Sequence, residues 1–327
     1  MNDTRPIIET LGLTKRFGEL KAVDHIDLSI REGEVFGLLG PNGAGKTTTL
    51  SMLATLLKPT EGTAKVDGHD VSTEPAAVRK SIGIVFQEPS SDDILTGREN
   101  LYLHALMYGV DRRIREQRFR EVLKLVDLED RADDQVKKYS GGMRRRLELA
   151  RGLLHKPKIL FLDEPTLGLD PQTREHIWQY IRRLVDLEHV TVILTTHYME
   201  EAERLCDRVA IIDDGRIIAL DTPERLKHII GGDIIRLRIQ NPQLGRIKEL
   251  GYVVKIDQAG DLVTLTVKDS GVHLQEILSL VGDVKSVELR TPTLNDVFLH
   301  FTGHEIRGDN AEGGFFQRVA RARSGGN

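Results

Sequence analysis

The stretch Gly40-Pro-Asn-Gly-Ala-Gly-Lys-Thr47 constrains the fold more than any other part of this sequence, because it fits the phosphate-loop pattern GxxxxGK[ST]. The apolar run Val35–Leu39 before it predicts a short buried strand, and Lys46–Leu57 after it predicts a helix. Glycines let the backbone approach a phosphate closely, and the N–H groups at a helix N-terminus attract anions. An ordinary glycine turn is the alternative, but the flanking strand and helix favour a nucleotide-phosphate site.

Two side chains of this loop are candidates for specific contacts with a nucleotide. Lys46 is expected to reach the β- and γ-phosphates, and the hydroxyl of Thr47 is expected to bind Mg²⁺. The dinucleotide fingerprint GxGxxG is not matched, because the glycines have the wrong spacing. The predicted nucleotide-binding residues of this loop are Gly40, Pro41, Asn42, Gly43, Ala44, Gly45, Lys46, Thr47 and Thr48.

The composition is that of an ordinary globular chain. The 327 residues suggest two or three domains, and 39% apolar residues are enough to build a core. A net charge of −4 gives no indication of a general nucleic-acid binder, so no nucleic-acid partner is expected. The single cysteine, Cys206, excludes an intrachain disulfide and is expected to be a small core residue. No apolar run approaches the ~20 residues of a membrane-spanning helix, and the polar N-terminus predicts no signal peptide.

Strand-like and helical segments alternate from residue 6 to about residue 220, which predicts an α/β core with a largely parallel sheet. Ile7–Leu11 and Ala22–Ile30 could pair as antiparallel strands near the start. Residues 98–155 are mainly helical in pattern and are expected to form an inserted subdomain. Asp213-Asp-Gly215 is a hairpin signal. We assign residues 5–228 to this first domain.

The pattern changes from about Gly231. Strands and helices are expected there in the order βαββαβ, with a helix at Gln243–Leu250, which suggests a small α+β, ferredoxin-like domain over residues 231–303. Thr291–Leu299 would add one more helix. Residues 304–327, rich in Gly and Arg, are expected to be a flexible tail. A solvated tail is favoured over a membrane-surface or partner contact at Phe315–Asn327.

Two carboxylates follow the apolar run Ile159–Leu162. A buried strand that ends in acids places them at the edge of the sheet, next to the phosphate loop. Asp163 is expected to hold Mg²⁺, and Glu164 is the candidate for polarising an attacking water. Alone, Asp-Glu at a strand end would be an ordinary turn, but the phosphate loop makes the catalytic interpretation the better one.

A second anion site is suggested by Tyr139-Ser-Gly-Gly-Met143 ahead of a predicted helix. Ser140 could cap the helix, and Gly141 and Gly142 would leave its first N–H groups open. Because this site and the phosphate loop lie in different subdomains, a phosphate bound by both would most naturally lie between two chains. Alone, Ser-Gly-Gly would more often be a linker or a cap.

Taken together, these residues resemble the nucleotide-binding subunit of an ABC (ATP-binding cassette) transporter, over residues 5 to about 225. Seven motifs occur in the family's order. Phe17 matches the aromatic residue that stacks on adenine, Gly40–Thr47 matches Walker A, and Gln87 matches the glutamine that touches Mg²⁺ and faces the transmembrane partner.

The remaining motifs complete the resemblance. Ser140, Gly141 and Gly142 match the signature, Asp163 and Glu164 match Walker B with its catalytic glutamate, Asp170 matches the D-loop, and His197 matches the switch histidine. Leu and Gln of the usual LSGGQ are replaced by Tyr139 and Met143, and Met143 cannot make a glutamine's polar contact. The sequence from Tyr139 to Leu147 and the C-terminal Thr291–Gly303 resemble the daunorubicin/doxorubicin-resistance branch of exporter ATPases.

The resemblance implies a head-to-tail homodimer that closes on two MgATP and drives a separate integral membrane permease at the cytoplasmic face of the cell membrane. The catalytic residues would be Glu164, His197 and Gln87, and the metal would be held by Thr47, Gln87 and Asp163. One alternative is a soluble ABC-type ATPase acting on ribosomes or DNA, although the usual tandem cassettes or coiled-coil insertion are missing. Another is a scaffold that binds nucleotide without hydrolysis, which Glu164 argues against. The sequence does not identify the cargo.

Overall fold

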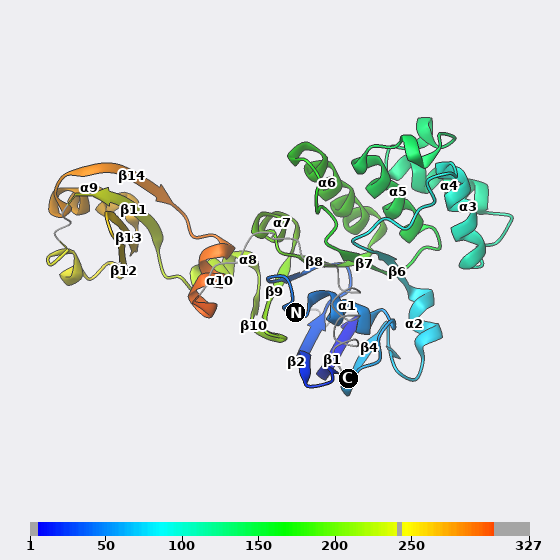
Figure 1. Ribbon diagram of the computed structural model, residues 1–327, viewed down its shortest axis with the longest axis horizontal. Helices are drawn as coiled ribbons and strands as arrows, with labels where there is room; N and C mark the ends of the chain where they lie inside the picture. Colours follow the sequence, from blue (N-terminus) through cyan, green and yellow to red (C-terminus); the bar gives the residue numbers. More distant parts are fainter. Residues whose placement is uncertain (1–5, 241–243, 304–327) are drawn as a thin grey trace, which may run out of the picture. The chain divides into compact units, whose positions relative to one another are not determined.

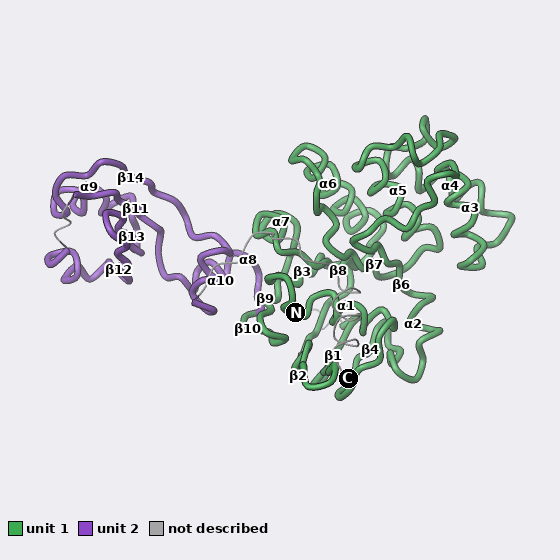
Figure 2. Tube along the Cα trace, in the orientation of Figure 1, with its two compact units in different colours: residues 1–219, 307–327 green, residues 220–306 purple. Residues whose placement is uncertain are grey.

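The computed structural model describes residues 6–240 and 244–303. These residues divide between Ala219 and Leu220 into two compact units, shown in different colours in Figure 2. The tail predicted over residues 304–327 lies outside the described residues, as do residues 241–243.

The centre of the first unit is a six-stranded sheet with the strand order β10-β9-β3-β8-β7-β6. Its inner strands β3, β7 and β8 are buried along their whole length, as expected for strands covered on both faces. The pairs β3–β8, β3–β9, β7–β8 and β6–β7 are parallel, which confirms the predicted sheet. The strands are β3 (Val35–Leu39), β6 (Ile82–Val85), β7 (Ile159–Asp163), β8 (Thr191–Thr196), β9 (Arg208–Asp213) and β10 (Arg216–Asp221).

A second sheet in this unit has the order β2-β1-β4-β5, and its pairs are antiparallel. β1 (Ile8–Phe17) and β2 (Leu20–Ile30) pair as predicted, and β4 (Glu61–Val66) and β5 (His69–Asp70) complete the sheet. The predicted hairpin at Asp213–Gly215 joins β9 and β10, with φ of 44° at Asp214 and 76° at Gly215.

Helix α1 (Lys46–Leu53) begins at the phosphate loop but is shorter than the predicted segment to Leu57. Thr55 has a φ of 62°, a left-handed conformation that ends the helix. Three helices pack on one another after β6, in the part of the chain where an inserted subdomain is predicted (Figure 1). They are α3 (Gly97–Met107), α4 (Arg115–Leu125) and α5 (Gly141–Leu153), with the short turns η1 (Glu129–Arg131) and η2 (Val136–Lys138) between α4 and α5.

The other helices of the first unit flank its strands. α2 (Pro75–Ser81) precedes β6, α6 (Pro171–Glu188) connects β7 to β8, and α7 (Met199–Leu205) connects β8 to β9. Cys206, directly after α7, is buried, in agreement with its predicted role in the core.

The second unit contains one antiparallel sheet with the order β12-β13-β11-β14. Its core is formed by alternate residues of β11 and β13, such as Leu237 and Leu265, and by Ile277 of α9. A helix is predicted over Gln243–Leu250, of which the structure describes residues 244–250, and these contain the 3₁₀ turn η3 (Ile247–Glu249) and no α-helix. The elements are α8 (Pro223–His228), β11 (Asp233–Ile239), β12 (Val253–Ala259), β13 (Leu262–Val267), α9 (Ser270–Val281), β14 (Val284–Arg290) and α10 (Leu294–Thr302).

Candidate functional site

Two glycines of the phosphate loop are held against neighbouring backbone. A Cβ at Gly40 would lie 2.1 Å from the carbonyl oxygen of Ile212. At Gly45, the residue before α1, it would lie 2.4 Å from the carbonyl oxygen of Ala22, and the φ of Gly45 is +102°. A side chain at either position would displace the loop, so the loop can hold its close curve only with glycine.

The substitution Gly45→Ala is therefore expected to destabilise the first unit by about 1–3 kcal/mol, through backbone strain and a steric clash. Denaturant unfolding and calorimetric ATP titration would measure the losses of stability and affinity. Gly109→Ala is the matched control, because Gly109 also has a positive φ, +65°, but a Cβ there meets nothing within 4 Å. Equal losses in the two variants would contradict this account of the loop.

The ammonium group of Lys46 lies across the loop. Its Nζ donates hydrogen bonds to the carbonyl oxygens of Gly40 at 2.7 Å and Pro41 at 3.0 Å. The same nitrogen lies 3.9 Å from Oε1 of Glu164, and both side chains are buried. The positive charge is thus held beside the curve of the loop and next to the predicted base.

Oxygen donors for a metal converge at the ends of β7 and α1. The hydroxyl of Thr47 donates to Oδ1 of Asp163 at 3.0 Å, and the hydroxyl of Thr195 donates to the same oxygen at 2.5 Å. Burial raises the pKa of Asp163, against the effect of these two hydrogen bonds and of Lys46. A hydroxyl and a carboxylate are hard oxygen ligands that suit Mg²⁺, which usually takes one or two protein ligands plus phosphate oxygens and water. The donor set therefore fits Mg²⁺.

Glu164 is positioned by its backbone and by His197. It has a φ of 46°, and its N–H donates to Oγ1 of Thr195 at 3.0 Å. Oε1 of Glu164 lies 3.1 Å from Nδ1 of His197. Burial favours the protonated acid, but the hydrogen bond with His197 and the charges of His197, Lys46 and Arg145 outweigh it, so the pKa of Glu164 lies below its usual value. Glu164 is therefore a carboxylate at neutral pH, as a general base must be.

The signature residues lie on a different element from the phosphate loop. Ser140 caps α5 and accepts from the N–H of Met143 at 3.2 Å, which confirms the predicted cap. A Cβ at Gly142 would lie 2.5 Å from Cγ2 of Thr173, whose N–H and hydroxyl both donate to Asp170. The structure thus brings the signature next to the D-loop, while none of the hydrogen bonds described for Ser140 reaches the phosphate loop.

Two predicted residues are more exposed than Lys46, Asp163 and Glu164. Gln87 is exposed just after β6. Phe17 is half-buried at the end of β1, and Nζ of Lys15 lies 5.3 Å from the centroid of its ring. Both side chains can therefore be reached from solvent, as contacts with a nucleotide or a partner would require.

Sequence reasoning missed three residues that support this site. Thr195 links Asp163 and Glu164 through the hydrogen bonds given above. Glu201 accepts from Oγ1 of Thr166 at 2.8 Å and from Nε1 of Trp178 at 3.0 Å, and so ties the loop after Glu164 to α7. Arg145, which is 6% exposed, donates to three carbonyl oxygens near the site. Burial lowers its pKa to about 10, so its guanidinium stays charged at neutral pH.

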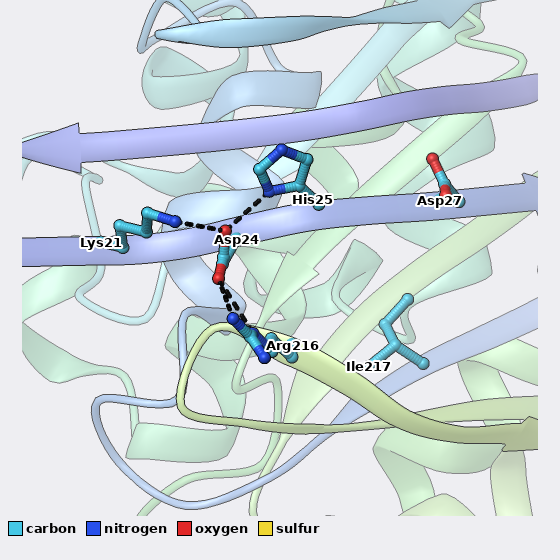
Figure 3. Close-up of a pocket in the computed structure, with 6 residues that line it drawn as sticks. All are labelled: Lys21, Asp24, His25, Asp27, Arg216 and Ile217. Carbon is cyan, nitrogen blue, oxygen red and sulfur yellow. Dashed lines mark hydrogen bonds and ion pairs between the residues drawn. The ribbon is translucent and has the colours of Figure 1, made fainter.

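A hollow of about 630 Å³ lies between β2 and β10 (Figure 3). Asp24 at its centre accepts from His25, Arg216 and Lys21, which hold the pKa of its carboxyl below the usual range. The N–H of Asp24 donates to Gly215, whose own N–H donates to the carbonyl of Ala44 in the phosphate loop. We interpret this network as support for the loop. The lining residues are Lys21, Asp24, His25, Asp27, Arg216 and Ile217.

Comparisons with known proteins agree with this geometry. The family model described as ABC transporter matches residues 23–167, and the one described as ATP-binding protein DrrA1-3-like, C-terminal domain, matches residues 222–302. The daunorubicin resistance ATP-binding protein DrrA2 of Streptomyces coeruleorubidus is 43% identical over 311 residues, which cover 92% of this chain and 96% of the relative. The chain belongs to the ABC transporter ATP-binding family. It is an ABC ATPase subunit, homologous to the ATPases of drug-resistance exporters.

Further matches include the linearmycin resistance ATP-binding protein LnrL of Bacillus subtilis (strain 168), 38% identical over 92% of this chain and 100% of that protein. Among solved structures, cbiO1 of Clostridium perfringens, part of the ABC transporter complex cbiONQ, has a TM-score of 0.64 at 28% identity and covers 69% of this chain and 94% of its own. A dimeric, post-hydrolysis structure of the cassette MJ0796 bound to ADP and Pi has a TM-score of 0.59 at 31% identity, with 66% and 98% covered.

These matches confirm the ABC cassette fold and the ATPase prediction. ATPase subunits of this family work with membrane permeases and form dimeric cassettes, and the findings give no support to the ribosome or DNA alternative. Within the described residues, no helix is both long and apolar enough to span a bilayer.

Proposed function

We propose that two copies of this chain bind head to tail, enclose two MgATP and drive an exporter permease at the cytoplasmic face of the cell membrane. One observation carries the proposal. One group of side chains combines a cation for phosphate, oxygen ligands for a metal and an ionised base: Lys46, Thr47, Asp163, Glu164 and His197. Thr47 is hydrogen-bonded to Asp163 and Glu164 to His197, and Nζ of Lys46 lies 3.9 Å from Oε1 of Glu164.

Each side chain of this group has a separate task. Lys46 would neutralise charge on the β- and γ-phosphates, and Thr47 and Asp163, with Gln87, would hold Mg²⁺. The metal, when bound, would stabilise charge that develops on the phosphate oxygens. Glu164 would accept a proton from the attacking water, and the hydrogen bond from His197 would orient its carboxylate. His197 would also contact the γ-phosphate.

The remaining predicted residues would complete the site from two chains. Ser140, Gly141 and Gly142 of one copy would face the γ-phosphate bound at the phosphate loop of the other. Asp170, next to Gly142 through Thr173, would lie at the same interface. Phe17 would stack on adenine, and Thr48 and the other loop residues would contact the phosphates.

The permease would dock near Gln87. The segment Glu88–Leu95 and the helices that follow it expose apolar side chains, including Ile94 at 72% and Met107 at 79%. A surface of this kind suits a protein partner better than water. The relatives' names concern resistance to daunorubicin and linearmycin, and on that basis we propose outward transport of a toxic small molecule.

This proposal can be tested by affinity purification of the full-length chain from its native membranes. An integral membrane subunit should co-purify, and the Mg²⁺-dependent ATPase activity of the complex should exceed that of the isolated chain. Co-purification with ribosomes, and without a membrane subunit, would instead support the alternative function.

We also propose that residues 5–228 form the cassette and residues 231–303 an accessory ferredoxin-like domain. The order β12-β13-β11-β14, antiparallel throughout, supports this assignment, with η3 replacing the first helix. The domain would modulate dimerisation or coupling to the permease.

Truncation tests the independence of the two domains. A chain ending at Asp221 keeps β10 complete and removes α8, which falls within the proposed range 5–228 but lies in the second compact unit. Because the nucleotide residues from Phe17 to His197 remain, we expect ATP affinity within about threefold of the full chain. Dimerisation or permease-stimulated ATPase activity should change. A folded truncated chain that has lost ATP binding in calorimetry would contradict the division.

A further inference from the structure

One arginine of the signature helix holds the backbone on both sides of Glu164. Arg145 lies on α5, five residues after Ser140. Its NH2 group donates to the carbonyl oxygen of Asp163 at 3.0 Å, and its Nε donates to that of Pro165 at 2.7 Å. These two carbonyls directly precede and follow Glu164. The guanidinium therefore fixes the backbone from which the predicted base projects.

The same guanidinium also reaches the segment that contains Gln87. Its NH1 group donates to the carbonyl oxygen of Phe86 at 2.5 Å. One turn later on α5, Glu148 accepts from the N–H groups of Ser90 at 3.2 Å and Ser91 at 2.8 Å. The segment around Gln87 is thus tied to α5 at both ends.

These hydrogen bonds connect α5 directly to the backbone on both sides of Glu164 and to the segment that contains Gln87. The Arg145 fork is planar and buried, so its donors cannot exchange carbonyl partners for water without a large cost. A helix moves as a rigid body, and a shift of its N-terminus would therefore be carried to the bonded carbonyls. We infer that Arg145 is a positioning residue that transmits the position of the signature helix to Glu164 and Gln87 of the same chain.

This inference rests on the proposed head-to-tail dimer and deepens it. There, Ser140 of a chain faces the nucleotide at one site, whereas Glu164 of that chain acts on the nucleotide at the other site. Arg145 thus links the two sites through a single chain. The neighbouring arginines cannot do this, because Arg144 pairs with Asp93 and Arg146 donates to the carbonyls of Val126 and Asp127, all in the segment from Gln87 to α5.

Steady-state ATPase kinetics of full-length Arg145→Met and Arg145→Lys test this role, with Arg146→Met as the matched control. We expect Arg145→Met to lower kcat by at least about tenfold while the Kd for MgATP, from calorimetry, stays within about twofold. Arg145→Lys keeps the charge but loses the planar fork, and should give an intermediate kcat. Arg146→Met should keep most of the kcat. If Arg145→Met does not fold by circular dichroism, Arg145→Lys carries the test.

A double-mutant cycle with Ser140→Ala separates transmission from simple loss of stability. If Arg145 carries the effect of the signature, the losses in kcat from Ser140→Ala and Arg145→Met will be less than multiplicative. Multiplicative losses, equal losses in the Arg145 and Arg146 variants, or an unchanged kcat in the Arg145 variants would overturn the inference. A wild-type chain without Mg²⁺-dependent ATPase activity would instead overturn the proposed function.

Discussion

Glu164→Gln is expected to lower kcat for ATP hydrolysis by about 10²- to 10⁴-fold, the range that general-base catalysis contributes. The amide keeps the shape of the side chain and can still contact His197, but it cannot accept a proton from water. Nucleotide binding should remain, because Lys46, Thr47 and the glycine loop are unchanged. Single-turnover kinetics with calorimetric titration of MgATP would separate the two effects.

The acidic side of the pH profile gives a second check on Glu164. Because the pKa of this carboxyl lies below its usual value, the base stays ionised as pH falls through the range where an ordinary glutamate becomes protonated. Activity limited by Glu164 should therefore be lost only below that range. Near-normal turnover in Glu164→Gln would show that another group activates the water.

Lys46→Ala is expected to weaken ATP binding by roughly 10- to 100-fold, as well as slowing turnover. The ammonium acts in the ground state, and a charge-assisted contact with phosphate contributes roughly 1.5–3 kcal/mol. Alanine also removes the donor to the carbonyls of Gly40 and Pro41, which would loosen the loop. Calorimetry with a slowly hydrolysed ATP analogue would give the affinity directly.

Lys158→Ala is a suitable control for Lys46→Ala, because it removes one positive charge elsewhere in the same unit. Lys158 is exposed and pairs with Asp67, and neither residue is among the predicted nucleotide-binding residues. Its loss should change affinity much less. An unchanged affinity in Lys46→Ala would contradict the assignment of this loop to phosphate.

The sequence was sufficient to predict the phosphate loop, the acids at the end of β7 and the Ser140 cap, because each depends on neighbouring residues. Thr195 could not be found in this way. Its contact with Asp163 depends on the parallel register of β7 and β8, in which Asp163 pairs with Thr195 across 32 positions. Arg145 could not be predicted for another reason. Three arginines occur in succession, and only tertiary packing decides which of them is buried.

The local sequence pattern also predicted two helices that differ in the structure: one is shorter and the other is a 3₁₀ turn. Lys46–Leu57 looks helical throughout, yet the chain leaves the helix after Leu53 and Thr55 adopts a left-handed conformation. In the second unit, the segment Gln243–Leu250 has helical spacing, but its described part, residues 244–250, forms only a 3₁₀ turn, in which Ile247 is packed into the core. In both cases tertiary packing outweighs a weak local preference.

The central claim, that two chains close on ATP through their signature residues, is tested most directly by the molar mass of Glu164→Gln in solution. Light scattering after size-exclusion chromatography should give twice the 36.7 kDa of one chain with MgATP and a single chain's mass without it. Adding Gly141→Asp to this variant should restore the single-chain mass with ATP, because a carboxylate would repel the phosphate, while a Cβ at Gly141 makes only an ordinary contact with Leu169 at 3.9 Å. A single-chain mass for Glu164→Gln at saturating MgATP would contradict the account.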